Sequence, residues 1–177
     1  MPPDPVRRNG CARTELDTPV GVVTMLASEE GIREVVLPED GPAVSGPELH
    51  TLEPDDPRAA HLTTALTQLG EYFGGARTTF DVPLDPVGTE FERGAWDVLR
   101  GIPYGETISY GEQAERMGDR RKARAVGGAN GRNPIAIVVP CHRVVGADGS
   151  LTGFGGGIEV KRWLLDHESG VAQLRME

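Results

Sequence analysis

A short apolar run near the end of the chain, residues 134–139, constrains the fold more than any other feature. It is too short to cross a membrane and has the length and composition of a buried strand. Pro140 ends it, because proline cannot donate to a central sheet ladder. The sequence therefore predicts a strand that stops inside the protein and presents Cys141, His142 and Arg143 at its end.

Cys141 is a candidate nucleophile. The thiolate is the reactive form of cysteine, and the neighbouring His142 and Arg143 favour it when they carry positive charge. Because consecutive residues of an extended chain point to opposite sides, we expect His142 to take the thiol proton through a bridging water. The other nitrogen of the imidazole then needs an acceptor, and Glu168 is available. The alternatives are structural: Cys141 as a small buried apolar residue, Arg143 as an ion-pair partner and Glu168 as a solvated carboxylate.

The charges of the chain are segregated, although the net charge is −9. Residues 1–86 carry six Arg and no Lys against fifteen Asp and Glu, which leaves this half at −9. Residues 87–177 carry twelve basic and twelve acidic side chains and are neutral overall. Within them, residues 116–143 hold seven Arg and Lys against Asp119 alone, a local charge of +6. This segment favours an anionic partner, and nucleic acid over a merely solvated helix face.

The N-terminal half, residues 1–86, is predicted to be a small α+β domain. Residues 1–12 are expected to form a disordered tail, which leaves Cys11 without a role. Two apolar stretches that flank a turn at residues 28–31 predict a hairpin, and apolar residues at helical spacing predict an amphipathic helix. The predicted strands cover residues 14–27, 31–37 and 78–84, and the predicted helix covers residues 59–73.

The C-terminal half, residues 87–177, is predicted to be mainly helical. Thr89 with Glu92, and Ser109 with Glu112, each form the capping-box pattern that begins a helix. Short helices joined by a tight turn are typical of the helix-turn-helix. Two further helices are expected, from Arg121 towards Ala129 and from Glu159 to Glu168.

The third predicted helix carries small residues beside the basic segment. Small side chains allow a helix backbone to approach a nucleic-acid groove closely, although they serve helix packing more often. The residues are Ala123, Ala125, Gly127 and Ala129.

Several motifs together resemble those of the O6-alkylguanine-DNA alkyltransferases. The resemblance is dense over residues 87–169 and weak before them. It implies a chain of mixed α/β class, with an N-terminal domain like ribonuclease H and a C-terminal helix-turn-helix domain of the winged-helix kind. The matching positions are 104–106, 109–110, 124–129, 133–134, 140–144, 153–157, Lys161, 163–165 and 167–168.

The resemblance implies a DNA-repair reaction. Cys141 would take the alkyl group from O6 of guanine in double-stranded DNA, or from O4 of thymine, and keep it as a thioether. Thioethers are poor leaving groups, so each molecule would act once, as a methylated-DNA–protein-cysteine S-methyltransferase. The implied catalytic residues are Cys141, His142, Glu168, Tyr110 and Asn133, of which Tyr110 supplies a hydroxyl at the base and Asn133 organises the thiol. The alternatives are a buried structural tyrosine and a turn-forming asparagine.

The resemblance also implies how DNA is held. The third helix would lie in the minor groove, the damaged base would be flipped out, and Arg124 would enter the vacated stack. The implied DNA-contacting residues are Arg121, Lys122, Ala123, Arg124, Ala125, Gly127 and Ala129. The implied substrate pocket contains Val144, Phe154, Gly155 and Gly156, where Phe154 and Gly155 replace the tyrosine and serine of some family members.

Cofactors, partners and location follow from composition and from what the chain lacks. The N-terminal half offers only Cys11, His50 and His61 as zinc-type ligands, so we expect no metal, and we expect no cofactor. The first residues are polar and proline-rich rather than a signal peptide. With two cysteines in the chain, this favours the cytoplasm and no membrane partner. We expect a monomer in solution, with cooperative binding along DNA left open.

Two other functions fit part of the sequence. A thiol hydrolase would use Cys141, His142 and Glu168 for acyl transfer, but it needs an oxyanion hole and leaves the Arg-rich helix without a purpose. A non-enzymatic binder of alkylated DNA would need no thiol, so Cys141 argues against it. Release of product over many turnovers would favour the hydrolase.

Overall fold

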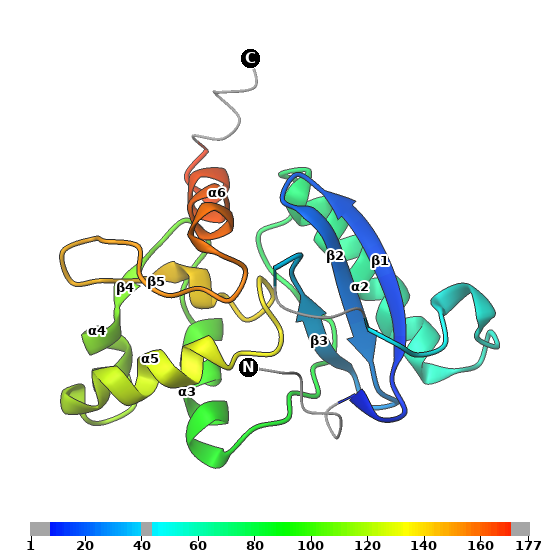
Figure 1. Ribbon diagram of the computed structural model, residues 1–177, viewed down its shortest axis with the longest axis horizontal. Coiled ribbons are helices and arrows are strands. Elements are labelled where there is room, and N and C mark those ends of the chain that lie inside the picture. The colour runs from blue at the N-terminus through cyan, green and yellow to red at the C-terminus, as the bar shows by residue number, and fades with distance from the viewer. Residues whose placement is uncertain (1–7, 40–43, 171–177) are drawn as a thin grey trace. The chain divides into compact units, whose positions relative to one another are not determined.

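The computed structural model describes residues 8–39 and 44–170. The chain divides into two compact units, of which the first ends at Val87 and the second begins at Gly88 (Figure 1). The predicted α/β class is confirmed, because the first unit contains a small antiparallel sheet and the second is mainly helical. None of the helices in the described part of the chain is both long and apolar enough to span a membrane.

A three-stranded antiparallel sheet and one long helix make up most of the first unit. The strands run in the order β1 (Ala12–Thr18), β2 (Gly21–Ala27) and β3 (Ile32–Val36), with a 3₁₀ helix, η1 (Leu49–Thr51), before the long helix α2 (Pro57–Phe73). Helix α2 lies along one face of the sheet and contacts β1 and β2 (Figure 1). It begins before the predicted residue 59 because the Asp56 carboxylate accepts from the Arg58 N–H at 2.9 Å and proline suits the first helical position.

The long predicted strand over residues 14–27 is two strands joined by a tight turn. Thr18 Oγ1 donates to the carbonyl of Gly21 at 2.6 Å and accepts from the N–H of Val20 at 3.2 Å, which closes the turn. Gly21 has a φ of 109°, a conformation that favours glycine. The apolar pattern runs through this turn, so the pattern alone did not show the break. The second hairpin lies at residues 28–31 as predicted, where the Ser28 N–H donates to the Gly31 carbonyl at 2.9 Å.

The predicted strand over residues 78–84 is wrong. Among those residues the structure places one isolated bridge, from Leu84 to Ile32. Pro83 explains why no ladder extends: it has no N–H to donate, while its carbonyl accepts from the Ile32 N–H at 2.8 Å. The segment therefore meets the sheet at its edge without becoming a strand.

The predicted disordered tail is wrong for residues 8–12, and residues 1–7 lie outside the described residues. Cys11 is buried and packs with Leu26 and Val44, and β1 begins at the next residue. Burial raises the pKa of the Cys11 thiol, more than the nearby arginines lower it. Cys11 is therefore a core residue of the first unit.

The two histidines considered as metal ligands in the first unit, His50 and His61, each lie close to an oxygen atom of the protein. His61 Nε2 is 3.0 Å from the carbonyl oxygen of Glu29, and His50 Nδ1 is 3.3 Å from a carboxylate oxygen of Glu48. Across residues 8–39 and 44–170, no three His, Cys, Asp or Glu side chains gather into a group that could hold a metal ion.

Helices and two very short strands make up the second unit (Figure 1). Both predicted capping boxes are confirmed. The Glu92 N–H donates to Thr89 Oγ1 at 3.2 Å and the Thr89 N–H donates to the Glu92 carboxylate at 2.8 Å; the same two bonds join Glu112 and Ser109 at 3.1 and 2.7 Å. The elements are α3 (Glu90–Arg100), β4 (Ile108–Ser109), α4 (Tyr110–Arg116), η2 (Arg120–Lys122), α5 (Ala123–Gly131), η3 (Cys141–Arg143), β5 (Val144–Val145) and α6 (Ile158–Glu168).

The apolar run at residues 134–139 is buried, but it is not a strand. Its backbone folds back on itself, with the Val138 N–H donating to the Ala136 carbonyl at 2.8 Å and the Val139 N–H donating to the Ile135 carbonyl at 2.9 Å. Between them Ile137 has a φ of 72°, which is strained for a β-branched residue. A short apolar run indicates burial; it does not distinguish a strand from another compact conformation.

Candidate active site and DNA-binding surface

Cys141 is the first residue of η3, directly after the compact turns. Its N–H donates to the Val139 carbonyl at 2.9 Å, and its side chain is almost fully buried. Because Cys141 and His142 lie on a 3₁₀ turn, our expectation of an extended chain with the two side chains on opposite sides is wrong. The parallel pairing of β4 with β5 sets Ser109 opposite Val145 and so brings the start of α4 beside η3.

Asn133 fixes the turns that lead to Cys141. Its Oδ1 accepts from the Ile135 N–H at 3.0 Å, and its Nδ2 donates to the Val139 carbonyl at 2.8 Å. The Val139 carbonyl thus receives both the Asn133 amide and the Cys141 N–H. One side chain therefore connects the end of α5 to the backbone of the thiol.

The structure brings His142 and Glu168 together across 26 residues of chain. His142 Nε2 lies 2.7 Å from Glu168 Oε1, and both side chains are buried. Burial lowers the pKa of His142, and the hydrogen bond and charge of Glu168 only partly offset this. The imidazole is therefore held neutral, with Nε2–H donating to the carboxylate. Nδ1 is buried and has no hydrogen-bond partner among the described residues, so its lone pair is available to accept a proton.

Glu168 is held by more than His142. Arg143 donates to Glu168 from Nε at 2.8 Å and from Nη2 at 2.9 Å, and the Gly105 N–H donates to it at 3.2 Å. Burial alone would raise the pKa of Glu168, but the hydrogen bonds from His142 and Arg143 hold it well below its usual range. Arg143 also donates to the Ile102 carbonyl at 2.6 Å. Arg143 is thus the ion-pair partner that the sequence left as an alternative.

Lys161 is a buried cation to which the sequence reasoning assigned no role. Its side chain is fully buried, and Nζ donates to the carbonyls of Val144 at 2.7 Å and Thr152 at 3.0 Å. In the described part of the chain, no carboxylate forms an ion pair with it. Burial lowers the pKa of Lys161, and negative charge on the Cys141 sulfur raises it. The signal available in sequence was a lysine placed on the inner face of the last helix.

Tyr110 is the first residue of α4 and contacts the loop between β5 and α6, which contains Thr152. Its hydroxyl donates to the Thr152 carbonyl at 3.1 Å, and its ring lies 5.9 Å from Lys161 Nζ. The four residues that the resemblance implies for the substrate pocket lie on β5 and in the loop after it, and they differ in exposure: Val144 and Gly156 are buried, Phe154 is half-buried and Gly155 is exposed.

The basic segment is partly neutralised by ion pairs. Arg120 pairs with Glu115 at 3.1 Å, Arg121 pairs with Asp119 at 2.9 Å, and Arg132 pairs with Glu92. The local charge counted along the sequence therefore overstates the charge that the folded surface offers to a partner.

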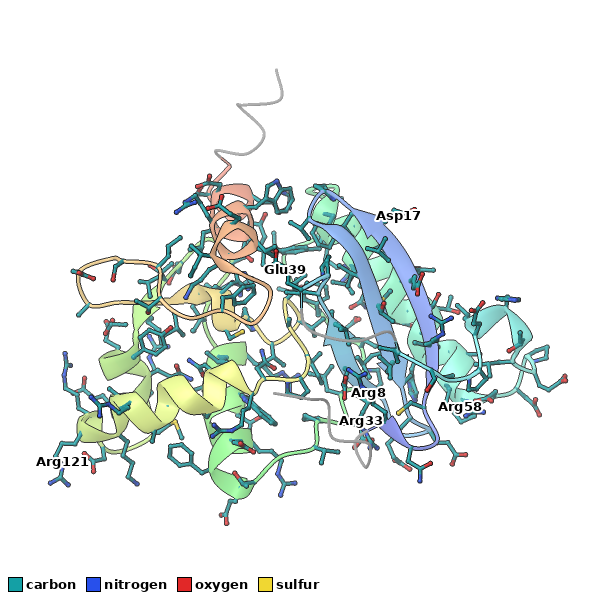
Figure 2. The ribbon with its side chains drawn as sticks, in the orientation of Figure 1. Arg8, Asp17, Arg33, Glu39, Arg58 and Arg121 are labelled. Atoms are coloured by element: carbon teal, nitrogen blue, oxygen red, sulfur yellow. The ribbon has the colours of Figure 1, made fainter. Side chains whose placement is uncertain are left out.

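The residues considered for DNA contact divide by exposure. Arg121 projects away from the unit, with 90% of its side chain exposed (Figure 2). Lys122, Arg124 and Ala125 are exposed, while Ala123 and Gly127 are half-buried. Ala129 is fully buried and its carbonyl accepts from Trp96 Nε1 at 2.9 Å, so its side chain belongs to helix packing and is not on the exposed face.

The chain resembles known proteins over both units. Residues 90–170 match the DNA binding domain of 6-O-methylguanine DNA methyltransferase, and residues 12–86 match the ribonuclease-like domain of that protein. The methylated-DNA–protein-cysteine methyltransferase of Mycolicibacterium paratuberculosis is 47% identical over 156 residues, covering 85% of this chain and 87% of the relative. That of Methanosarcina acetivorans is 43% identical over 152 residues, covering 86% and 94%.

Solved structures agree with these matches. Mycobacterium tuberculosis OGT in complex with DNA has a TM-score of 0.80 at 43% identity, covering 91% of this chain and 94% of that one. The structure of Mycobacterium tuberculosis O6-methylguanine methyltransferase has a TM-score of 0.77 at 40% identity, covering 94% and 99%. The resemblance expected from the sequence motifs is confirmed, and the chain belongs to the 6-O-methylguanine DNA methyltransferase family of methylated-DNA–protein-cysteine methyltransferases.

Proposed function

We propose that Cys141 receives the alkyl group in the reaction of this family, DNA repair by transfer of an alkyl group to a cysteine of the protein. The substrate is O6-alkylguanine in double-stranded DNA, and O4-alkylthymine as a second substrate. The observation that carries the proposal is the buried hydrogen bond between Glu168 and His142, the residue that follows Cys141. That arrangement gives a thiol a neutral base and gives the base an orienting carboxylate.

The thiol proton passes from Cys141 to Nδ1 of His142, directly or across one water. Glu168 stabilises the imidazolium that forms, because its carboxylate already accepts from Nε2. Burial holds the imidazole neutral until the thiol proton arrives, and the charge of Arg143, which shares that carboxylate, adds to this effect. The ammonium of Lys161 is most stable when the sulfur is a thiolate, so the two charges favour each other.

The thiolate then attacks the alkyl carbon on O6 in line with the bond that breaks. The new carbon–sulfur bond forms as the carbon–oxygen bond breaks, and its electron pair stays on the base. Tyr110 donates its hydroxyl proton to the leaving base, which departs as neutral guanine, and the proton that His142 took from the thiol replaces it. The thioether stays on Cys141, so one molecule of protein repairs one base.

The helix-turn-helix of the second unit holds the DNA, and residues 1–86 support it. The exposed cations Arg121, Lys122 and Arg124 with Ala125 form the contact surface on and before α5. A duplex hides O6 from a buried sulfur, so the base must be flipped out, which costs a few kcal/mol. Arg124 enters the vacated stack, for which a planar guanidinium is well suited. Half-buried Phe154 and exposed Gly155 belong to the pocket proposed for the alkyl group.

Intact mass after mixing with a duplex that contains O6-methylguanine tests the proposal. We expect each chain to gain one methyl group on Cys141 and then stop. Cys11→Ala should gain the same mass, whereas Cys141→Ala should gain none and still bind the duplex. Product released without any gain in protein mass would instead support the thiol hydrolase, and binding without transfer would support a non-enzymatic binder. Sedimentation of the same mixtures tests the expected monomer and any cooperative clustering.

A further inference from the structure

Three polar contacts converge on the C-terminal end of α5. Trp96 Nε1 on α3 donates to the Ala129 carbonyl at 2.9 Å. Gln113 on α4 and Asn130 exchange two amide hydrogen bonds, of 2.9 and 2.7 Å. Just beyond the helix, Arg132 pairs with Glu92 of α3. One end of the helix is thus tied to both neighbouring helices.

The amide pair is the most constraining of these contacts. Gln113 Nε2 donates both to Asn130 Oδ1 and to the Ala95 carbonyl at 3.1 Å, so one side chain joins α3, α4 and α5. Gln113 is fully buried and Asn130 is 8% exposed. A buried amide that loses its partner is costly, and its hydrogen bonds are directional. The pair therefore admits one register of the three helices, where apolar side chains would tolerate several.

This end of α5 leads directly to the thiol. The Asn130 carbonyl accepts from the Asn133 N–H at 3.1 Å, and the Asn133 side chain holds the turns before Cys141. The exposed residue Arg124 lies at the other end of the same helix. The amide pair therefore stands between the surface proposed for DNA and the atom proposed to react.

We propose that Gln113 and Asn130 are positioning residues, which fix α5 relative to Cys141 so that a base delivered by DNA on α5 reaches the sulfur. This role rests on the proposed function. It concerns the geometry of the bound complex, since neither amide touches the thiol or contributes charge. A misplacement of about 1 Å costs roughly a hundredfold in rate, so a modest change of helix register is enough to matter.

The test replaces the pair by apolar residues of similar shape, Gln113→Met with Asn130→Leu. No amide is then left without its partner, which favours folding. We expect single-turnover methyl transfer from saturating duplex to fall at least about tenfold, while alkylation of Cys141 by iodoacetamide stays within about twofold. Gln68→Met is the matched control, because Gln68 is a buried amide of the first unit that pairs with Asp81; it should change neither rate.

A second variant covers the case in which the double variant does not fold. Trp96→Phe removes the contact to the Ala129 carbonyl but keeps an aromatic ring, and it should lower the duplex rate selectively in the same way. Duplex rates equal to wild type, or equal losses with duplex and with iodoacetamide, would overturn the positioning role alone. A wild-type chain that takes no methyl group from duplex would overturn the proposed function, and this role with it.

Discussion

Replacing Lys161 by Met tests how Cys141 becomes reactive. The ammonium is fully buried against two carbonyls, and the charge that acts on it favourably is that of the Cys141 sulfur. Met has a similar length and no charge, so the substitution removes the cation and keeps most of the packing. We expect the pKa of the Cys141 thiol to rise.

The size of the effect follows from two opposing dependences on pKa. A nearby opposite charge shifts a pKa by about 1 to 3 units, and each unit lowers the thiolate fraction about tenfold at a pH below the pKa. A more basic thiolate is also more nucleophilic, by about 10^0.4 to 10^0.5 per unit. The net loss is therefore about threefold to fourfold per unit, or roughly 3-fold to 60-fold at neutral pH.

The assay is the rate of iodoacetamide alkylation of Cys141 as a function of pH. Peptide mass spectrometry separates Cys141 from Cys11, a second buried cysteine whose thiol pKa is raised by burial. The rate should titrate at higher pH in Lys161→Met, and above its raised pKa the variant should react at least as fast as wild type. This recovery at high pH distinguishes a charge effect from a misfolded site.

Arg162→Met is the matched control. Arg162 is the next residue on α6, half of its side chain is exposed, and it pairs with Glu159 at 2.6 Å. The Arg162→Met variant also loses one positive charge, but at the protein surface. The pH at which the alkylation rate of Cys141 titrates should therefore equal that of the wild type. If Lys161→Met also titrates there, Lys161 does not stabilise the thiolate and the reasoning fails.

Three further predictions address the proton relay and the DNA surface. Glu168→Gln should lower the free energy of unfolding by about 3–5 kcal/mol in urea titrations, because it leaves the buried charge of Arg143 without its counter-ion; a loss below about 1 kcal/mol would contradict the buried ion pair. The pKa of His142 is lower in the folded chain than in the unfolded one, so the unfolded chain binds more protons between the two values, and the free energy of unfolding should fall as pH drops below about 6.5. Unfolding that is independent of pH between about 7 and 5 would argue against a buried neutral imidazole. Arg124→Ala should weaken duplex binding and transfer together, and wild-type affinity should fall as salt rises; affinity that is independent of salt would refute the basic-surface assignment.

Local features of the sequence predicted where two helices of the second unit begin. The capping boxes of Thr89 and Ser109 act over three residues, so their hydrogen bonds could be read from spacing alone. The first unit was harder, because the apolar pattern continues through the turn at Thr18 and Gly21. Cys11 was assigned to a tail since nothing local shows that it packs against Leu26.

The candidate site was predictable in its residue types and in the contact of His142 with Glu168, but not in its contacts to the backbone. The side chains of Asn133 and Lys161 bind backbone groups that only the tertiary fold brings to them, and no sequence pattern predicts those contacts. The strained turn at Ile137 likewise depends on residues that lie close to it only in the folded chain. Buried polar residues are where composition misleads most, because burial turns an ordinary lysine or glutamine into a constraint on its surroundings.

The carboxylate of Glu168 also fastens the last helix. Glu168 is the final residue of α6, and through it that helix is joined to Gly105 and Arg143. The proposed chemistry and the packing of this helix therefore depend on the same two carboxylate oxygens, so a substitution of Glu168 changes both. An unreactive but folded variant, for trapping damaged DNA or for crystallisation, is therefore better made by replacing Cys141 than by replacing Glu168.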